Sequence, residues 1–137
     1  MAAELTADAH DLVAAARDLI RVDDSRTAGL WPRAAAMLCR QAVEESLATL
    51  WDLRSPAMAQ TSTKCQLLCL GDFIHDAELA GRVSLTWNGL SRACHVRVYE
   101  LAPTADELGS WLECAWELAD AVMREGRLTA VPGAPLR

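Results

Sequence analysis

The sequence predicts an all-α fold, an antiparallel up-and-down bundle of four long helices and one short helix. Apolar residues recur along several segments at the i, i+3, i+4, i+7 spacing that places them on one helix face. No segment alternates polar and apolar residues with the period of two that a half-buried strand requires. The 137 residues are 52% hydrophobic, which suffices for one domain with its own core. We therefore expect a helical bundle domain over residues 1–126 and an extended C-terminal tail over 127–137.

Two helices are expected in the first half of the chain. The first follows Thr6, whose hydroxyl suits an N-cap, and runs to about Val22. The second begins at Pro32, because proline is favoured in a first helical turn, and it stops before Ser55-Pro56. The predicted core face of this second helix consists of Ala35, Leu38, Cys39, Ala42, Ser46, Leu50 and Leu53.

Two more helices are expected in the middle of the chain. A short helix from about Thr63 to Leu70 is closed by Gly71, since glycine commonly ends helices. Asp76 then caps a long helix that runs to about Leu101. The apolar face of the long helix consists of Ala80, Val83, Trp87, Leu90, Cys94, Val98 and Leu101.

The last helix opens with a capping box. The Thr104 hydroxyl can accept a hydrogen bond from the N–H of Glu107, whose carboxylate can reach back to the cap. Gly126 is the expected stop of this helix. Its predicted buried face consists of Leu108, Trp111, Leu112, Ala115, Ala119 and Val122.

Charge and hydropathy exclude several classes of protein. The net charge of −6 argues against a general nucleic-acid coat, because such proteins bind through a basic surface. A small local site built from a few arginines stays compatible with that charge. No apolar run is long enough to cross a membrane, and the first residues lack the basic and apolar regions of a secretory signal. A cytoplasmic protein is therefore expected.

The five cysteines, Cys39, Cys65, Cys69, Cys94 and Cys114, predict no disulfide framework, because their number is odd. Most are expected to be small buried apolar residues with reduced thiols. Cys65 and Cys69 can meet on one helical face, but the second close pair of a structural zinc site is missing. We expect no metal and no cofactor.

The most informative polar residues lie near the end of the fourth helix. Asn88, Arg92, His95 and Tyr99 are separated by four, three and four positions. A continuous helix would place all four within about 60° of arc, away from the apolar face. A polar face satisfied by neighbouring helices, or a wet dimer interface, would produce the same pattern.

These residue types suit chemistry on RNA. Arginine can hold a phosphate with a forked pair of donors, and histidine can move a proton near neutral pH. The 2′-hydroxyl of RNA is an internal nucleophile, so cleavage needs only proton transfer and charge stabilisation. We therefore predict Arg92 and His95 as catalytic residues, with Asn88, Tyr99 and Arg40 as substrate-binding residues. The other histidines, His10 and His75, are expected on the solvated surface.

Five tryptophans are many for a chain of this length. Trp87 and Trp111 fall on core faces, and a small-ligand pocket between them is one alternative reading. Trp51 lies at the edge of the core face of its helix, and Trp116 lies off that of the last helix. Both therefore indicate a partner surface. A homodimer is the expected assembly.

Two segments resemble the HEPN superfamily of small helical-bundle domains. Residues 34–47 are similar to the early helix of that family, with its Arg-Gln-Ala-hydrophobic-Glu core, and residues 91–95 hold Arg92 and His95. Active members form dimers in which two arginine–histidine motifs line one cleft and cut RNA without metal. Fewer residues separate Arg92 from His95 than in those active members. The resemblance implies a bacterial toxin–antitoxin or anti-phage system.

Two functions remain open at this stage beside the small-ligand pocket. The first is an RNA- or nucleotide-binding dimer that acts as a metal-independent ribonuclease. The second is a dimeric, non-enzymatic module that binds an antitoxin or another partner protein through tryptophan-bearing helix faces.

Overall fold

The fold was obtained as a computed structural model, which describes residues 8–21, 31–95 and 101–130. These residues form five α-helices and one short 3-10 helix, so the predicted all-α class is confirmed. The elements are α1 (Ala9–Arg21), α2 (Trp31–Arg54), η1 (Pro56–Gln60), α3 (Thr63–Ile74), α4 (Ala77–Cys94) and α5 (Ala105–Ala130). Because α1 has 13 residues and α3 has 12, the first helix is hardly longer than the predicted short one.

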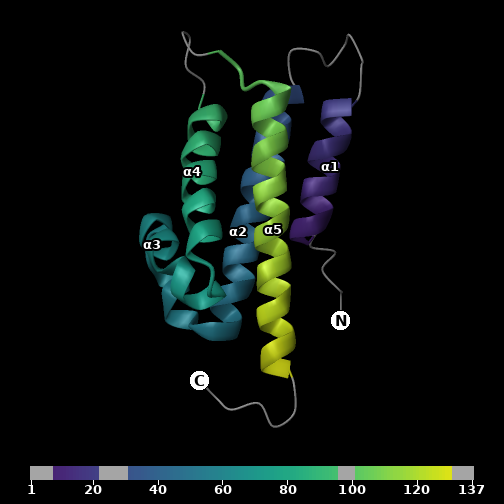
Figure 1. Ribbon diagram of the computed structural model, residues 1–137. Coiled ribbons are helices and arrows are strands. Elements are labelled where there is room, and N and C mark those ends of the chain that lie inside the picture. Colours follow the sequence, from purple (N-terminus) through teal and green to yellow (C-terminus); the bar gives the residue numbers. More distant parts are fainter. Residues whose placement is uncertain (1–7, 22–30, 96–100, 131–137) are drawn as a thin grey trace, which may run out of the picture.

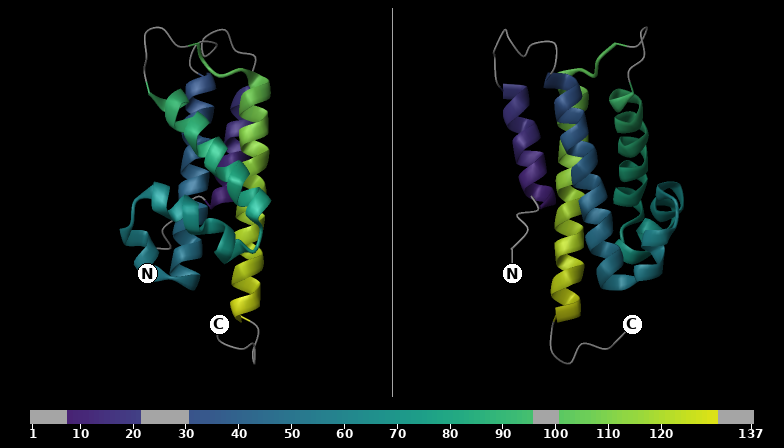
Figure 2. Two further views of the ribbon diagram at one scale, coloured as in Figure 1. Left: turned by 60° about the vertical axis from the view of Figure 1, so that its left-hand side comes forward. Right: turned by 180° about the vertical axis from the view of Figure 1, so that it is seen from behind.

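The two longest helices, α2 and α5, pack against each other at the centre of the fold (Figure 1). The views in Figure 1 and Figure 2 place α1 on one side of this pair and α4 on the other. α3 packs mainly on α4, near the lower end of the molecule as drawn in Figure 1. The end of α4 therefore lies beside the beginnings of α2 and α5, and this end of the molecule contains the predicted site.

Several helix boundaries differ from the sequence prediction. α1 begins after Asp8, whose carboxylate accepts a hydrogen bond from the N–H of Asp11 at 2.8 Å. The predicted start after Thr6 is wrong because this aspartate takes the capping role two residues later. α3 continues through Gly71 to Ile74 and ends at His75, which adopts a left-handed conformation with φ 56°. The predicted stop at Gly71 is therefore wrong as well.

The C-terminal ends of α4 and α5 also differ from the sequence prediction. Asp76 caps α4 as predicted, accepting a hydrogen bond from the N–H of Leu79 at 2.9 Å. α4 nevertheless ends at Cys94 and not near Leu101, which lies outside any helix and is 98% exposed. α5 passes through the expected stop at Gly126 and reaches Ala130.

The core lies between α2, α4 and α5, with α1 covering one side. The predicted faces of α2 and α5 are buried, apart from the half-buried Leu38 and Trp111 and the exposed Leu53. One ion pair is enclosed in this packing, between Arg54 of α2 and Glu125 of α5 at 2.8 Å. No helix among residues 8–21, 31–95 and 101–130 is long and apolar enough to cross a membrane.

The predicted capping box forms at the start of α5. The Glu107 N–H donates to the Thr104 hydroxyl at 3.1 Å, and the Glu107 carboxylate accepts from the Thr104 N–H at 3.4 Å. We expect Thr104→Ala to lower the free energy of unfolding by about 1 kcal/mol, because the Glu107 N–H loses its acceptor and the Glu107 carboxylate loses the hydroxyl that donates to it. Urea denaturation followed by circular dichroism measures this change. Ser110→Ala, at an exposed position of α5, is the matched control and should leave stability nearly unchanged.

Candidate functional site

Asn88, Arg92 and His95 of the predicted stripe lie at the end of α4, but they do not form one continuous stripe. Asn88 and Arg92 are one helical turn apart on α4, and both are exposed. His95 is the first residue beyond the helix and has an extended backbone, with φ −85° and ψ 132°. Tyr99 lies outside the described residues. The helical alignment therefore holds for Asn88 and Arg92 and does not extend to His95.

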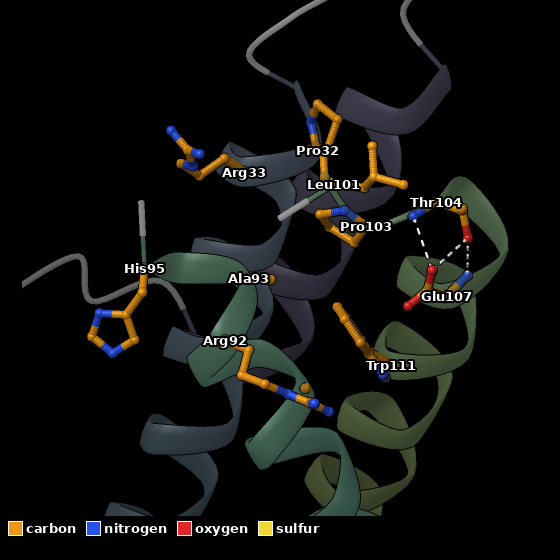
Figure 3. Close-up of a pocket in the computed structure, with 12 residues that line it drawn as sticks. Pro32, Arg33, Arg92, Ala93, His95, Leu101, Pro103, Thr104, Glu107 and Trp111 are labelled. Carbon is orange, nitrogen blue, oxygen red and sulfur yellow. Dashed lines mark hydrogen bonds between the residues drawn. The ribbon is translucent and has the colours of Figure 1, made fainter. Parts of the chain in front are cut away.

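A pocket of about 390 Å³ opens where the start of α2, the end of α4 and the start of α5 meet. Figure 3 shows the Arg92 side chain reaching across this pocket toward Trp111 of α5. The His95 ring points away from Arg92, on the other side of the backbone of α4. The two predicted catalytic side chains thus border one pocket without converging in it.

The pocket owes part of its shape to a close approach of α4 and α5. A Cβ atom built on Gly89 would lie 2.6 Å from Cζ2 and 2.9 Å from Cε2 of Trp111. Any side chain at position 89 would therefore push the indole away, since real Cβ contacts are not that short. Trp111 is half-buried and lines the pocket, whereas Trp87 does not. This pocket is therefore not one that Trp87 and Trp111 line together.

The charge of the pocket comes from two arginines. Arg33 at the start of α2 and Arg92 both line it, together with one carboxylate, that of Glu107. Glu107 already accepts hydrogen bonds in the capping box of α5. Within the described ranges no carboxylate forms an ion pair with either arginine. The pocket therefore offers a positive rim beside an aromatic ring.

Arg40 does not belong to this pocket. Its guanidinium lies over the indole of Trp87, 4.9 Å from the ring centre, and pairs with Glu44 at 3.2 Å. It borders a separate, mostly apolar groove on α2, which also includes Met37 and Cys94. Contact with the same ligand as Arg92 would therefore require that ligand to reach around the end of α4.

The two tryptophans expected on a partner surface both pack against other parts of the chain. Trp51 is 1% exposed; its indole N–H donates to the Gln66 side chain at 2.9 Å, and Phe73 packs edge-on against its ring. Trp116 is half-buried beneath α1, with the His10 ring packed edge-on against it at 4.4 Å. Trp51 is therefore too buried to form part of a partner surface, whereas Trp116 keeps part of its side chain exposed.

His10 is not the solvated surface residue that the sequence predicted. Its Nε2 lies 2.9 Å from the Asp120 carboxylate, and its side chain is 19% exposed. This contact joins α1 to α5 beside Trp116. His75 is exposed, as expected.

The thiols are free in the described residues. Cys39 and Cys114 are buried, whereas Cys65, Cys69 and Cys94 have intermediate exposure. Burial, together with the smaller effects of the Cys114 and Cys94 thiols, raises the pKa of Cys39 to about 12. Among residues 8–21, 31–95 and 101–130, no group of three or more histidine, cysteine or carboxylate side chains is placed to hold a metal ion.

The residues that line the pocket differ from the predicted site residues. Arg33 and Trp111 join Arg92 at the pocket, and the sequence signal for Arg33 was only its place at the start of a helix. Guanidinium groups bind phosphate oxygens and an indole ring stacks on a base, so this set suits a nucleotide or an RNA segment. Comparisons of the chain with protein-family models, curated proteins and solved structures gave no match.

Proposed function

We propose that this protein is an HEPN-like helical bundle of the antiparallel up-and-down type that binds RNA or a nucleotide as a cytoplasmic homodimer. The observation that carries the proposal is the pocket at the end of α4, where Arg33 and Arg92 lie beside Trp111. A phosphate would pair with the guanidinium groups, and a base would stack on the indole. Such a local site is compatible with the net charge of −6.

Cleavage of RNA by this protein would need a second copy. Arg92 and His95 of one chain point in different directions, so a single chain in this arrangement does not bring both to one phosphate (Figure 3). In a dimer that joins the two α4 ends, His95 of one protomer would face Arg92 of its partner. His95 would then take the proton of the 2′-hydroxyl or protonate the leaving 5′-oxygen, and Arg92 would stabilise the charge on the phosphate. The expected system is a bacterial toxin or anti-phage system.

Arg92→Ala is expected to weaken binding of a fluorescein-labelled single-stranded RNA about ten-fold, or roughly 1.4 kcal/mol, because one phosphate contact is lost. Fluorescence anisotropy measures the affinity, and the slope of its dependence on salt should fall by about one. Arg127→Ala removes an exposed arginine of the last turn of α5, far from the pocket, and should bind like the wild type. Equal loss in both variants would show that binding depends only on total charge.

Substitution of His95 distinguishes RNA binding from RNA cleavage. His95→Ala should keep the affinity for RNA while abolishing cleavage that persists in EDTA, because only the proton transfer is removed. An RNA with a single 2′-deoxy nucleotide at the cleaved position should resist the wild type. If the wild type binds RNA and cleaves none, the protein is a binding module and the ribonuclease assignment is wrong.

A second candidate function, partner binding without catalysis, is favoured by the apolar groove on α2. This groove has a volume of about 610 Å³, and Met37 at its edge is 56% exposed. An antitoxin or another partner protein would place an apolar side chain there. Met37→Asp should then abolish partner binding or dimerisation, measured by sedimentation velocity, while Arg92→Ala leaves both intact.

A further inference from the structure

Two thiols on α3 lie together, outside the pocket and outside the core. Cys65 and Cys69 are four positions, or about one helical turn, apart on α3, so their side chains lie on the same face of the helix. Both side chains have intermediate exposure, so solvent reaches them. α3 buries a different set of residues toward the core, namely Leu67, Leu70 and Ile74. The proposed RNA-binding function uses neither thiol.

The spacing of this pair disfavours a disulfide and favours a bridging ion. Side chains at i and i+4 on a helix have their Cβ atoms about 5–6 Å apart. A disulfide requires about 3.5–4.5 Å between those atoms, so it would distort α3. A single ion held between two sulfur atoms fills the longer gap without moving the helix.

The number of side chains available as metal ligands indicates which metal ion this pair can bind. No third histidine, cysteine or carboxylate among the described residues completes a site. Structural zinc takes four protein ligands and iron–sulfur clusters are held by four cysteines, so both would lack donors here. Cu(I) is a soft ion that prefers thiolates and is stable with two of them. We infer that Cys65 and Cys69 form a two-thiolate binding site for one Cu(I) ion.

The local charges determine how the complex forms. Binding releases one proton from each thiol to solvent and leaves two thiolates around one Cu(I), with a net charge of −1. Cys65 is the third residue of α3 and its N–H donates to the Ser62 cap at 3.2 Å, so it lies in the first turn, where the helix dipole favours negative charge. Partial desolvation raises the pKa of Cys69, and the adjacent Cys65 thiol and Asp72 raise it further. A cation between the sulfurs offsets the repulsion between the two thiolates.

The core thiols are a poorer site for the same ion. Cys39 and Cys114 are buried, and burial raises the pKa of both, which disfavours the thiolate that copper requires. Cys94 is half-buried at the end of α4 and supplies the matched control, since it is a free thiol without an i+4 cysteine partner.

The test is an anaerobic titration of the reduced full chain with Cu(I) in competition with a chromogenic Cu(I) chelator. The wild type should withdraw one equivalent of copper per chain from the chelator. Cys65→Ser and Cys69→Ser should each abolish that equivalent, whereas Cys94→Ser should retain it. Circular dichroism of the copper-free variants measures whether each is folded, and their intermediate exposure favours a small effect of serine on the fold. Retention of copper in both α3 variants, its loss in Cys94→Ser, or no binding by the wild type would each overturn the assignment.

Discussion

Arg54→Ala is expected to lower the free energy of unfolding by about 3 kcal/mol, the largest stability loss that we predict for this chain. The Arg54 guanidinium lies 2.8 Å from the Glu125 carboxylate, with side-chain exposures of 19% and 6%. Removing the arginine leaves a carboxylate enclosed between α2 and α5 without its counter-charge, and desolvation of that charge dominates the loss. Urea denaturation at neutral pH, followed by circular dichroism, measures the effect.

Two further variants identify the cause of this loss. Arg82 of α4 also pairs with a carboxylate of α5, that of Glu117, but its side chain is 44% exposed. Arg82→Ala should therefore cost much less than Arg54→Ala, because water solvates the remaining carboxylate. Replacing the enclosed pair together, as Arg54→Met with Glu125→Leu, should recover most of the lost stability. Equal losses in Arg54→Ala and Arg82→Ala would show that enclosure of the pair does not matter.

The sequence was informative about local interactions. The caps at Asp76 and Thr104 each depend on side chains within three positions of the helix start, so their residue types predicted them. The all-α class followed from the apolar spacing, which reflects which side of each helix is buried. Both kinds of signal lie within one segment of the chain.

The sequence was uninformative where distant segments meet. Trp51 lies at the edge of its apolar face, and it is buried because Gln66 and Phe73 of α3 fold over it. Leu101 continues the apolar spacing of α4 but is almost fully exposed, so it provides no packing energy that would extend the helix. Periodicity records only that an apolar residue is present, not that a neighbouring helix covers it.

In the candidate site, too, local features were predicted from the sequence and contacts between distant segments were not. The spacing of Asn88 and Arg92 predicted correctly that both lie on the exposed side of α4. The arrangement of Arg33 and Trp111 around Arg92 depends on how the starts of α2 and α5 pack beside the end of α4. No local pattern contains that packing. The RNA-binding proposal therefore rests on a pocket in which the sequence predicted Arg92, but not Arg33 or Trp111, as part of an RNA site.

Gly89→Ala should destabilise the fold by about 1–2 kcal/mol, although alanine is normally favoured over glycine in a helix by about 1 kcal/mol. The new methyl group would lie 2.6 Å from the Trp111 ring, so either the indole rotates or α4 moves away from α5. The backbone of α4 is held by its own hydrogen bonds, and the indole is a rigid group, which leaves no inexpensive adjustment. Thermal and urea denaturation both measure this change.

Gly81 provides the matched control on the same helix. A Cβ atom at Gly81 meets nothing within 4 Å, so Gly81→Ala should stabilise the protein by roughly 0.5–1 kcal/mol. The two substitutions are chemically identical and should have opposite signs, because only one of them meets a tryptophan. Stabilisation of similar size in both would show that α4 and α5 do not approach as closely as the structure places them.

The same substitution links the packing to the proposed function. Displacing Trp111 removes the aromatic surface beside Arg92, so Gly89→Ala should also weaken RNA binding, whereas Gly81→Ala should not. Adding Trp111→Leu to Gly89→Ala should relieve the steric contact and recover part of the stability without restoring RNA binding. If Gly89→Ala destabilises the fold but leaves RNA affinity unchanged, Trp111 stabilises the packing of α4 on α5 and takes no part in binding the base.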